Sequence, residues 1–119
     1  MARIIIVDDE VCCRRVLAAQ LASLGHTVVA IGSSGMDAIK ALFLNKNIDL
    51  VISDYSMGAG LNGAELSDCI NHAWPGLHFL LVSGNPPENF SGHVLEKPIS
   101  QKILAETIDA ILTRTKKTA

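Results

Sequence analysis

The feature that most constrains the fold is a run of four β-branched residues near the N-terminus, Ile4 to Val7, which stops at Asp8 and Asp9. β-Branched side chains favour extended backbone, and a continuous apolar run has no polar face to turn toward water. The run therefore predicts a strand that is buried on both faces, as in a parallel sheet covered by helices on both sides. It is too short for the apolar core of a signal peptide.

Further short apolar runs follow this one, and helix-like spacing of apolar residues fills most of the intervals between them. The predicted strands cover residues 4–7, 27–31, 48–53, 77–82 and 93–96. The first two predicted helices cover residues 11–24 and a stretch from Ser34 to about Lys46, and the third runs through Leu66, Ile70 and Ala73. Pro98 opens the last predicted helix. Its buried face is made of Ile103, Leu104, Ile108, Ile111 and Leu112. Strands that alternate with helices imply parallel strands joined by right-handed crossovers, hence an α/β fold with a doubly wound sheet.

Length and composition exclude several classes of protein. We expect one domain over residues 1–119 with no output domain, because 119 residues leave no room for a second sizeable core. The net charge of −2 gives no basic field for nucleic acid, and no apolar run is long enough to span a membrane. The three cysteines cannot form the even-numbered disulfide framework of a secreted scaffold, so we expect a reduced, cytoplasmic protein.

Polar residues that could bind a ligand or take part in a reaction follow four of the predicted strands. Asp8 and Asp9 follow the first, Asp54 the third, Ser83 the fourth and Lys97 the fifth. The carboxyl ends of parallel strands meet at one edge of the sheet, where doubly wound proteins bind their ligands. Three carboxylates brought together there would repel one another unless a cation lay among them, and oxygen ligands suit a hard ion such as Mg²⁺.

Four motifs on these strand ends resemble the receiver domain of bacterial response regulators. They are Val7-Asp8-Asp9-Glu10, Asp49-Leu50-Val51-Ile52-Ser53-Asp54, Val82-Ser83-Gly84 and Glu96-Lys97-Pro98-Ile99. Each motif is weak alone, but the ordered set is specific and covers nearly the whole chain. The resemblance implies a flavodoxin-like sheet of five parallel strands in the order 2-1-3-4-5.

The resemblance also implies a function and its residues. Asp54 would accept a phosphoryl group from the phosphohistidine of a histidine kinase or phosphotransfer protein. The Mg²⁺ ligands would be Asp8, Asp9, Asp54 and the backbone carbonyl of Ser56; Lys97 and Ser83 would contact the phosphoryl group; Ser83, Gly84 and Val94 would belong to the switch region. Such a chain signals to a downstream protein through protein contacts, and it is not an enzyme beyond catalysing its own phosphorylation and dephosphorylation.

Three departures from the family pattern affect this interpretation. Met57 is followed by Gly58 where the family usually has proline, and Val94 stands where the family commonly has an aromatic residue. Lys97 lies only 14 positions after Ser83, too few for a helix of about 11 residues, two loops and a strand. We therefore predict that the fourth helix is missing or reduced to one turn, which would leave side chains of strands 77–82 and 93–96 thinly covered and open to a homodimer or partner.

Two other functions stay open at this point. A degenerate receiver could bind a partner without phosphorylation, although the acidic residues, Ser83 and Lys97 are all present. A Mg²⁺-dependent aspartyl phosphatase of the haloacid dehalogenase type has a related topology. That family places its nucleophile in an Asp-x-Asp arrangement after the first strand, whereas Asp8 and Asp9 are adjacent here.

Overall fold

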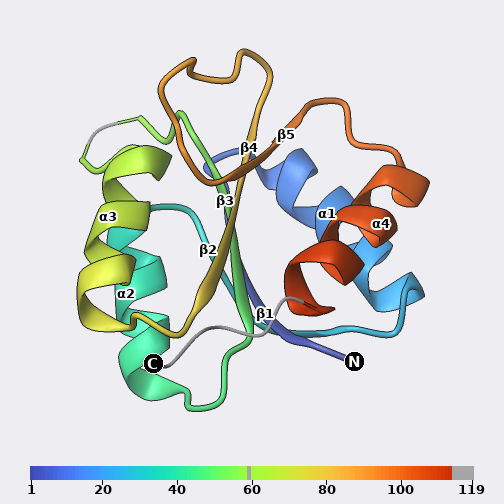
Figure 1. Cartoon of the computed structure of the whole chain (residues 1–119), viewed down its shortest axis with the longest axis horizontal. Helices are drawn as coiled ribbons and strands as arrows, with labels where there is room; N and C mark the ends of the chain where they lie inside the picture. The colour runs from blue at the N-terminus through green and yellow to red at the C-terminus, as the bar shows by residue number, and fades with distance from the viewer. Residues whose placement is uncertain (59, 114–119) are drawn as a thin grey trace.

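The computed structural model describes residues 1–58 and 60–113 and contains a five-stranded parallel sheet in the order β2-β1-β3-β4-β5 (Figure 1). The strands are β1 (Arg3–Val7), β2 (Thr27–Gly32), β3 (Leu50–Asp54), β4 (His78–Ser83) and β5 (His93–Glu96). The helices in the described residues are α1 (Val11–Ser23), α2 (Gly35–Leu44), α3 (Gly63–Ala73) and α4 (Gln101–Thr113). The predicted fold class and strand order are confirmed. No helix of the described residues is long and apolar enough to cross a membrane.

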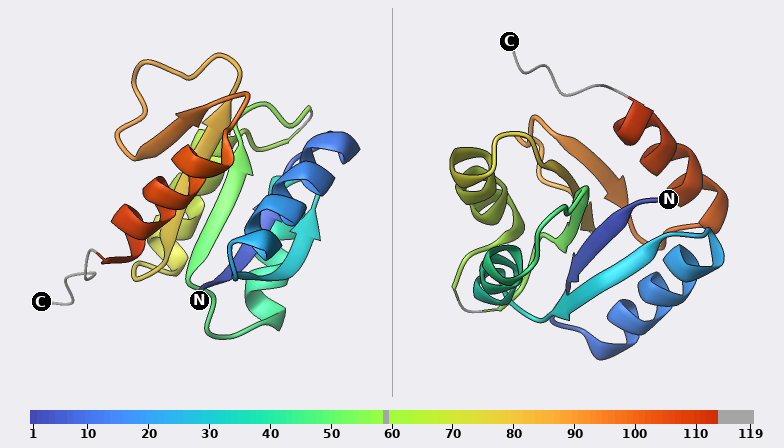
Figure 2. Two further views of the ribbon diagram at one scale, coloured as in Figure 1. Left: turned by 90° about the vertical axis from the view of Figure 1, so that its right-hand side faces the viewer. Right: turned by 90° about the horizontal axis from the view of Figure 1, so that it is seen from below.

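The sheet separates two hydrophobic cores because successive side chains of a strand point to opposite faces. On one face, Ile4 and Ile6 of β1 pack with Leu21 of α1 and Ile108 of α4. The other face carries a second cluster, from β1, β3 and β4, which packs against α2 and α3. Figure 2 shows α1 and α4 on the same face of the sheet. The β-branched run at the N-terminus is thus buried on both sides, as predicted.

The parallel register brings the carboxyl ends of the central strands to one edge. Val7 of β1 lies opposite Ser53 of β3, and Asp54 lies opposite Val82 of β4. Asp54 and Ser83 are the last residues of their strands, each one position beyond the predicted end. The residues that follow Val7 therefore emerge beside Asp54.

The segment between β4 and β5, residues 84–92, contains no helix, as its length and its prolines predict. The helix labelled α4 follows β5 instead. The expected thin cover over β4 is wrong, because Phe79 and Leu81 are buried and the ring of Phe90 from this segment lies 6.4 Å from that of Phe79. Only Val94, 37% exposed, remains of the predicted apolar patch, so a homodimer through this face loses its structural basis.

Two details of the last helix also differ from the prediction. It begins at Gln101 and not at Pro98, which lies in the connection after β5. Ile103 is 45% exposed, whereas Leu104, Ile108 and Ile111 are buried. The sequence also has basic residues near its C-terminus, Arg114, Lys116 and Lys117, whose charge would complement a helix end; they lie outside the described residues.

Gly63, the first residue of α3, lies too close to β3 and β4 for any side chain. A Cβ atom there would lie 2.5 Å from the backbone oxygen of Asp54 and 2.4 Å from Cδ1 of Leu81. Its own N–H donates to the carbonyl oxygen of Tyr55 at 2.8 Å. This close approach fixes α3 against the strand end that carries Asp54.

We expect Gly63→Ala to lower the free energy of unfolding by about 1–3 kcal/mol, because the backbone oxygen of Asp54 cannot move away without disturbing β3. Gly76→Ala is the matched control, since a Cβ atom there meets nothing within 4 Å. Urea denaturation of both variants measures the effect. Equal stability of the two variants would contradict the packing described for Gly63.

Candidate functional site

The turn from β1 to α1 holds two carboxylates at the carboxyl edge of the sheet. Asp8 is 2% exposed, whereas Asp9 is exposed. Oδ1 of Asp8 accepts a hydrogen bond from the N–H of Glu10 at 2.9 Å, and its backbone oxygen accepts one from Nη1 of Arg14 at 2.7 Å. The backbone N–H of Asp8 donates to Gly32 of β2 at 3.1 Å. These bonds hold the turn in one conformation.

Asp54 brings the third carboxylate to the same place. Its Oδ1 accepts a hydrogen bond from the N–H of Tyr55 at 3.0 Å. One carboxylate oxygen from each of Asp8, Asp9 and Asp54 lies within 4.8 Å of the others. Three anionic oxygens at this spacing are the donor set that a hard divalent cation prefers, so the residues fit Mg²⁺.

Lys97 places a positive charge between two of these carboxylates. Its Nζ lies 3.0 Å from Oδ2 of Asp8 and 3.3 Å from Oδ1 of Asp54. Burial lowers the pKa of Lys97, but the hydrogen bond and charge of Asp8, with the charge of Asp54, outweigh burial and raise it. Its backbone N–H donates to the carbonyl oxygen of Ser83 at 2.9 Å, which ties the lysine to the end of β4. The side chain is therefore a fixed ammonium group.

The environment of Asp54 disfavours its charge. Burial is the largest cause, and repulsion from Asp8 adds to it, so the pKa of Asp54 is raised although Lys97 and the N–H of Tyr55 act in the opposite direction. A buried carboxylate with a raised pKa, beside a fixed cation and two further carboxylates, marks a functional site. One lysine does not neutralise three carboxylates, so a cation added here would lower the electrostatic energy of the site.

Ser83, Gly84 and Ser56 lie at or just after the same strand ends, whereas Val94 is the second residue of β5 and lies opposite Leu81 of β4. Ser83 is buried, and its hydroxyl oxygen accepts a hydrogen bond from the N–H of Asn85 at 3.0 Å. Gly84 is exposed directly after it, and Ser56 is exposed in the loop after β3. Val94 lies in β5 and is partly exposed. The hydroxyl of Ser83 thus bonds its own loop.

Sequence reasoning missed two supports of the site. The guanidinium of Arg14 holds the backbone of Asp8, and the N–H of Tyr55 holds the carboxylate of Asp54. An arginine in the first turns of a helix is too common to be a signal, and backbone donors leave no mark in a sequence.

A second group of possible metal ligands, made of the carboxylates of Asp8 and Glu10 and the thiol of Cys13, also lies close together. Burial and the bond to Glu10 raise the pKa of the Cys13 thiol, which disfavours the thiolate that a metal would need.

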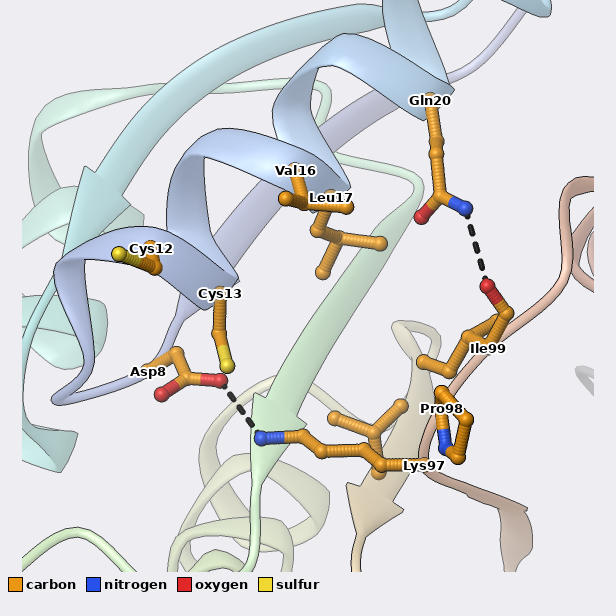
Figure 3. A pocket seen from close by; sticks show the side chains of 10 residues that line it. Asp8, Cys12, Cys13, Val16, Leu17, Gln20, Lys97, Pro98 and Ile99 are labelled. Atoms are coloured by element: carbon orange, nitrogen blue, oxygen red, sulfur yellow. Dashed lines mark hydrogen bonds and ion pairs between the residues drawn. The ribbon is translucent and has the colours of Figure 1, made fainter.

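A cleft of about 410 Å³ opens beside the carboxylates, between α1 and the connection after β5 (Figure 3). Asp8 and Lys97 lie at one end of it, and Cys13 and Leu17 of α1 line one wall. At the far end Nε2 of Gln20 donates to the backbone oxygen of Ile99 at 3.0 Å. The site can therefore be approached along a mostly apolar surface.

We expect Asp54→Asn to stabilise the metal-free protein at neutral pH. The pKa of Asp54 is raised above its ordinary value of 3.8, so ionisation costs stability; the cost is absent below the unfolded pKa and complete above the folded one. Unfolding curves should therefore show that the free energy of unfolding of the wild type falls as pH rises from the unfolded pKa of Asp54 to its folded pKa. The free energy of unfolding of the variant should fall less over this interval. Identical pH profiles would contradict the electrostatics described for Asp54.

Solved structures with the same fold include receiver domains from several bacteria. The response regulator receiver domain protein from Clostridium thermocellum superposes with a TM-score of 0.85 at 23% identity and covers 96% of each chain. The receiver domain of the PhyR response regulator from Erythrobacter litoralis has a TM-score of 0.85 at 18% identity, over 99% of this chain and 95% of that one. At these identities the likeness shows the fold.

Sequence comparison shows the family. The sensor histidine kinase RcsC of Salmonella typhimurium is 32% identical over 97% of this chain, and the sensor kinase CckA of Brucella abortus is 30% identical over 95% of it. The chain spans 13% of the length of each of these kinases. The family profile described as "Response regulator receiver domain" matches residues 4–109, and the chain belongs to the response regulator receiver domain family of two-component signalling.

Proposed function

We propose that the chain is a phosphorylation-controlled switch in which Asp54 accepts a phosphoryl group from the phosphohistidine of a histidine kinase or phosphotransfer protein. The observation that carries the proposal is the ammonium of Lys97 held between Asp8 and Asp54, with Asp9 completing a trio of carboxylates. A lysine that only stabilises the fold needs one carboxylate partner. A site that stabilises a transferred phosphoryl group needs several charged groups close together, which can rearrange around that group.

The chemistry asks little of the protein beyond position. A carboxylate oxygen of Asp54 attacks phosphorus in line with the leaving nitrogen, the P–N bond to the histidine breaks, and an acyl phosphate forms. Lys97 already contacts Oδ1 of Asp54 and would contact a phosphoryl oxygen attached there. The N–H of Tyr55 holds Oδ1 of the same carboxylate and so limits its rotation. These residues orient the nucleophile and receive negative charge on the transferred group.

Asp8, Asp9, Asp54 and the backbone carbonyl of Ser56 are the ligands that we assign to Mg²⁺. When bound, this ion would neutralise negative charge on the carboxylates and on the phosphoryl oxygens. The proposal rests on the donor set of the three carboxylates and on the excess of negative charge over Lys97. Asp8 is held by Lys97 and Glu10, while Asp9 is exposed and free to adjust to an ion.

Ser83 provides a route from the phosphoryl group to the surface. Its hydroxyl can rotate to donate to a phosphoryl oxygen, and its oxygen now accepts the N–H of Asn85 in the helix-free segment. A change at Ser83 therefore acts on the segment 84–92 directly. We propose that Ser83, Gly84 and this segment carry the signal to a downstream protein, because Val94 cannot supply an aromatic side chain.

Two further parts of the proposal concern partners and location. The relatives of the chain include sensor kinases, which supports a histidine kinase or phosphotransfer protein as the donor. Cys12, Cys13 and Cys69 are free thiols, which supports a reducing compartment and hence the cytoplasm.

Incubation with acetyl phosphate and Mg²⁺ should add one phosphoryl group to the wild type and none to Asp54→Asn, because acyl phosphate formation needs the carboxylate oxygen. Intact-mass spectrometry measures the adduct. Asp68→Asn removes an exposed carboxylate on α3 and should be phosphorylated like the wild type. An unmodified wild type would favour a receiver that binds its partner without phosphorylation, and steady turnover of a small phosphate ester would favour an aspartyl phosphatase.

Mg²⁺ should stabilise the folded protein by mass action, by about 2.7 kcal/mol at a hundredfold excess over its dissociation constant. Asp9→Asn should reduce this gain, because it removes one carboxylate of the trio while leaving the contact between Asp8 and Lys97 intact. Thermal unfolding with and without Mg²⁺ measures the gain. Glu106→Gln, an exposed change on α4, should keep it. An equal gain in Asp9→Asn would exclude Asp9 as a ligand.

A further inference from the structure

A groove of about 580 Å³ lies at the opposite end of the sheet from the carboxylates, between the C-terminal ends of α2 and α3. Residues near these two helix ends line it, together with the segments that lead into β3 and β4, residues 45–48 and 74–77. Figure 1 shows α2 and α3 side by side on one face of the sheet, with these ends away from the orange loop after β4. The groove therefore shares no residue with the proposed phosphorylation site.

Two large apolar side chains are exposed at this groove. Phe43 of α2, which lines it, is 75% exposed, and the next residue, Leu44, is 83% exposed. The rings of Phe43 and Trp74 meet edge to face with their centres 5.2 Å apart, so Phe43 is held in position although most of its surface faces water. Neighbouring exposed apolar side chains beside a groove mark an interaction surface.

The apolar surface continues along α2 as a stripe. Met36 is 56% exposed and lies seven positions before Phe43, so the two side chains share a face of the helix and lie about 10 Å apart along it. Lys40 lies between them on that face and is exposed. A surface of this length suits a segment of another protein better than a small ligand.

The charges beside the groove are positive. Lys46 lines it, Lys40 lies further back on α2, and no aspartate or glutamate among the described residues lines the groove. The sole acidic residue of α2, Asp37, lies in the first turn of the helix, where its carboxylate accepts hydrogen bonds from the N–H and the hydroxyl of Ser33. A carboxylate that approaches the groove therefore meets ammonium groups.

A second copy of this chain fits the surface poorly for the same reason. A two-fold contact brings the same patch of each copy together, so Lys40 and Lys46 of one copy would lie near Lys40 and Lys46 of the other. Like charges placed against each other across an interface oppose association, whereas opposite charges favour it. The two lysines therefore select a partner that carries acidic residues.

We propose that α2 and the groove beside it bind a partner protein through an amphipathic helix whose apolar face is bordered by aspartate or glutamate. One apolar side chain of that helix enters the groove beside Phe43 and Trp74, and another packs along the stripe toward Met36. Carboxylates beside them meet Lys40 and Lys46. A helix suits this surface because the stripe runs along α2, and side chains of one helix pack between those of another.

The probe is the peptide acetyl-Glu-Leu-Glu-Glu-Leu-Leu-Glu-Glu-Leu-Glu-amide, whose leucines have helical spacing. It is titrated into ¹⁵N-labelled, unphosphorylated protein while amide chemical shifts are followed. Saturable shifts should appear at residues 36–48 and 73–77, with a dissociation constant on the order of 0.1 mM. The matched peptide with lysine in place of every glutamate should bind about tenfold more weakly, because it brings like charges together.

Variants of the protein separate the apolar contact from the charges. The double variant Lys40→Glu, Lys46→Glu should reverse the preference, so that the lysine peptide binds more tightly than the glutamate peptide. Phe43→Ala should weaken binding of the glutamate peptide about tenfold, because Phe43 is the apolar wall of the groove. The control double variant Arg15→Glu, Lys102→Glu changes two exposed residues on α1 and α4 and should keep the original preference.

Circular dichroism establishes that each variant is folded. An unchanged preference in the variant with both α2 lysines replaced, unchanged affinity in Phe43→Ala, shifts centred elsewhere, or the absence of saturable shifts would overturn the proposal. The titration needs no phosphoryl group, and Asp54→Asn should bind the glutamate peptide like the wild type. Failure of this inference therefore leaves the proposed function of Asp54 untouched.

Discussion

The repulsion among three carboxylates at one edge of the sheet is the constraint on which the rest of the structure depends. Asp8, Asp9 and Asp54 approach one another because two neighbouring parallel strands, β1 and β3, end together, and a parallel sheet offers no other place for the residues at these ends. Lys97 relieves part of the repulsion by contacting two of them. The free energy that offsets the remaining repulsion comes from the two apolar cores on either side of the sheet. Burial of β1 and β3 in these cores supplies it.

The segment after β4 shows how a shortened connection can still cover the sheet. Phe90 packs near Phe79, and Gly92 leaves room for its ring. One aromatic side chain therefore covers part of the sheet face that an amphipathic helix would otherwise cover. The cover is incomplete: Val94 stays partly exposed, and a hollow remains against α3. Because Ser83 bonds Asn85 at the start of this segment, the same stretch of chain connects the strand end beside Asp54 to the surface over α3.

Much of the fold follows from the sequence because strands and helices leave different patterns in it. The buried strands are continuous β-branched runs, whereas the helices have apolar residues at intervals of three or four positions. The parallel sheet and the convergence of Asp8, Asp54 and Lys97 follow from the alternation of strands and helices, whereas the strand order was implied by the resemblance to receiver domains; all are found as expected. The functional roles of these residues remain predictions. The sequence could not show that Phe90 turns back onto β4, since a single aromatic residue in a loop has no period. It also placed Ile103 on the buried face, because neighbouring positions 103 and 104 are both apolar and only contact with the sheet selects one of them.

The central claim is that Asp54 itself becomes an acyl phosphate. Phosphoramidate, a small donor with the P–N bond of phosphohistidine, can load the protein in the presence of Mg²⁺, and borohydride then reduces an aspartyl phosphate to homoserine. Tandem mass spectrometry locates the reduced residue. Homoserine should form at position 54 alone. Homoserine at position 8 or 9, or no reduced residue in protein that carries a phosphoryl group, would contradict the claim.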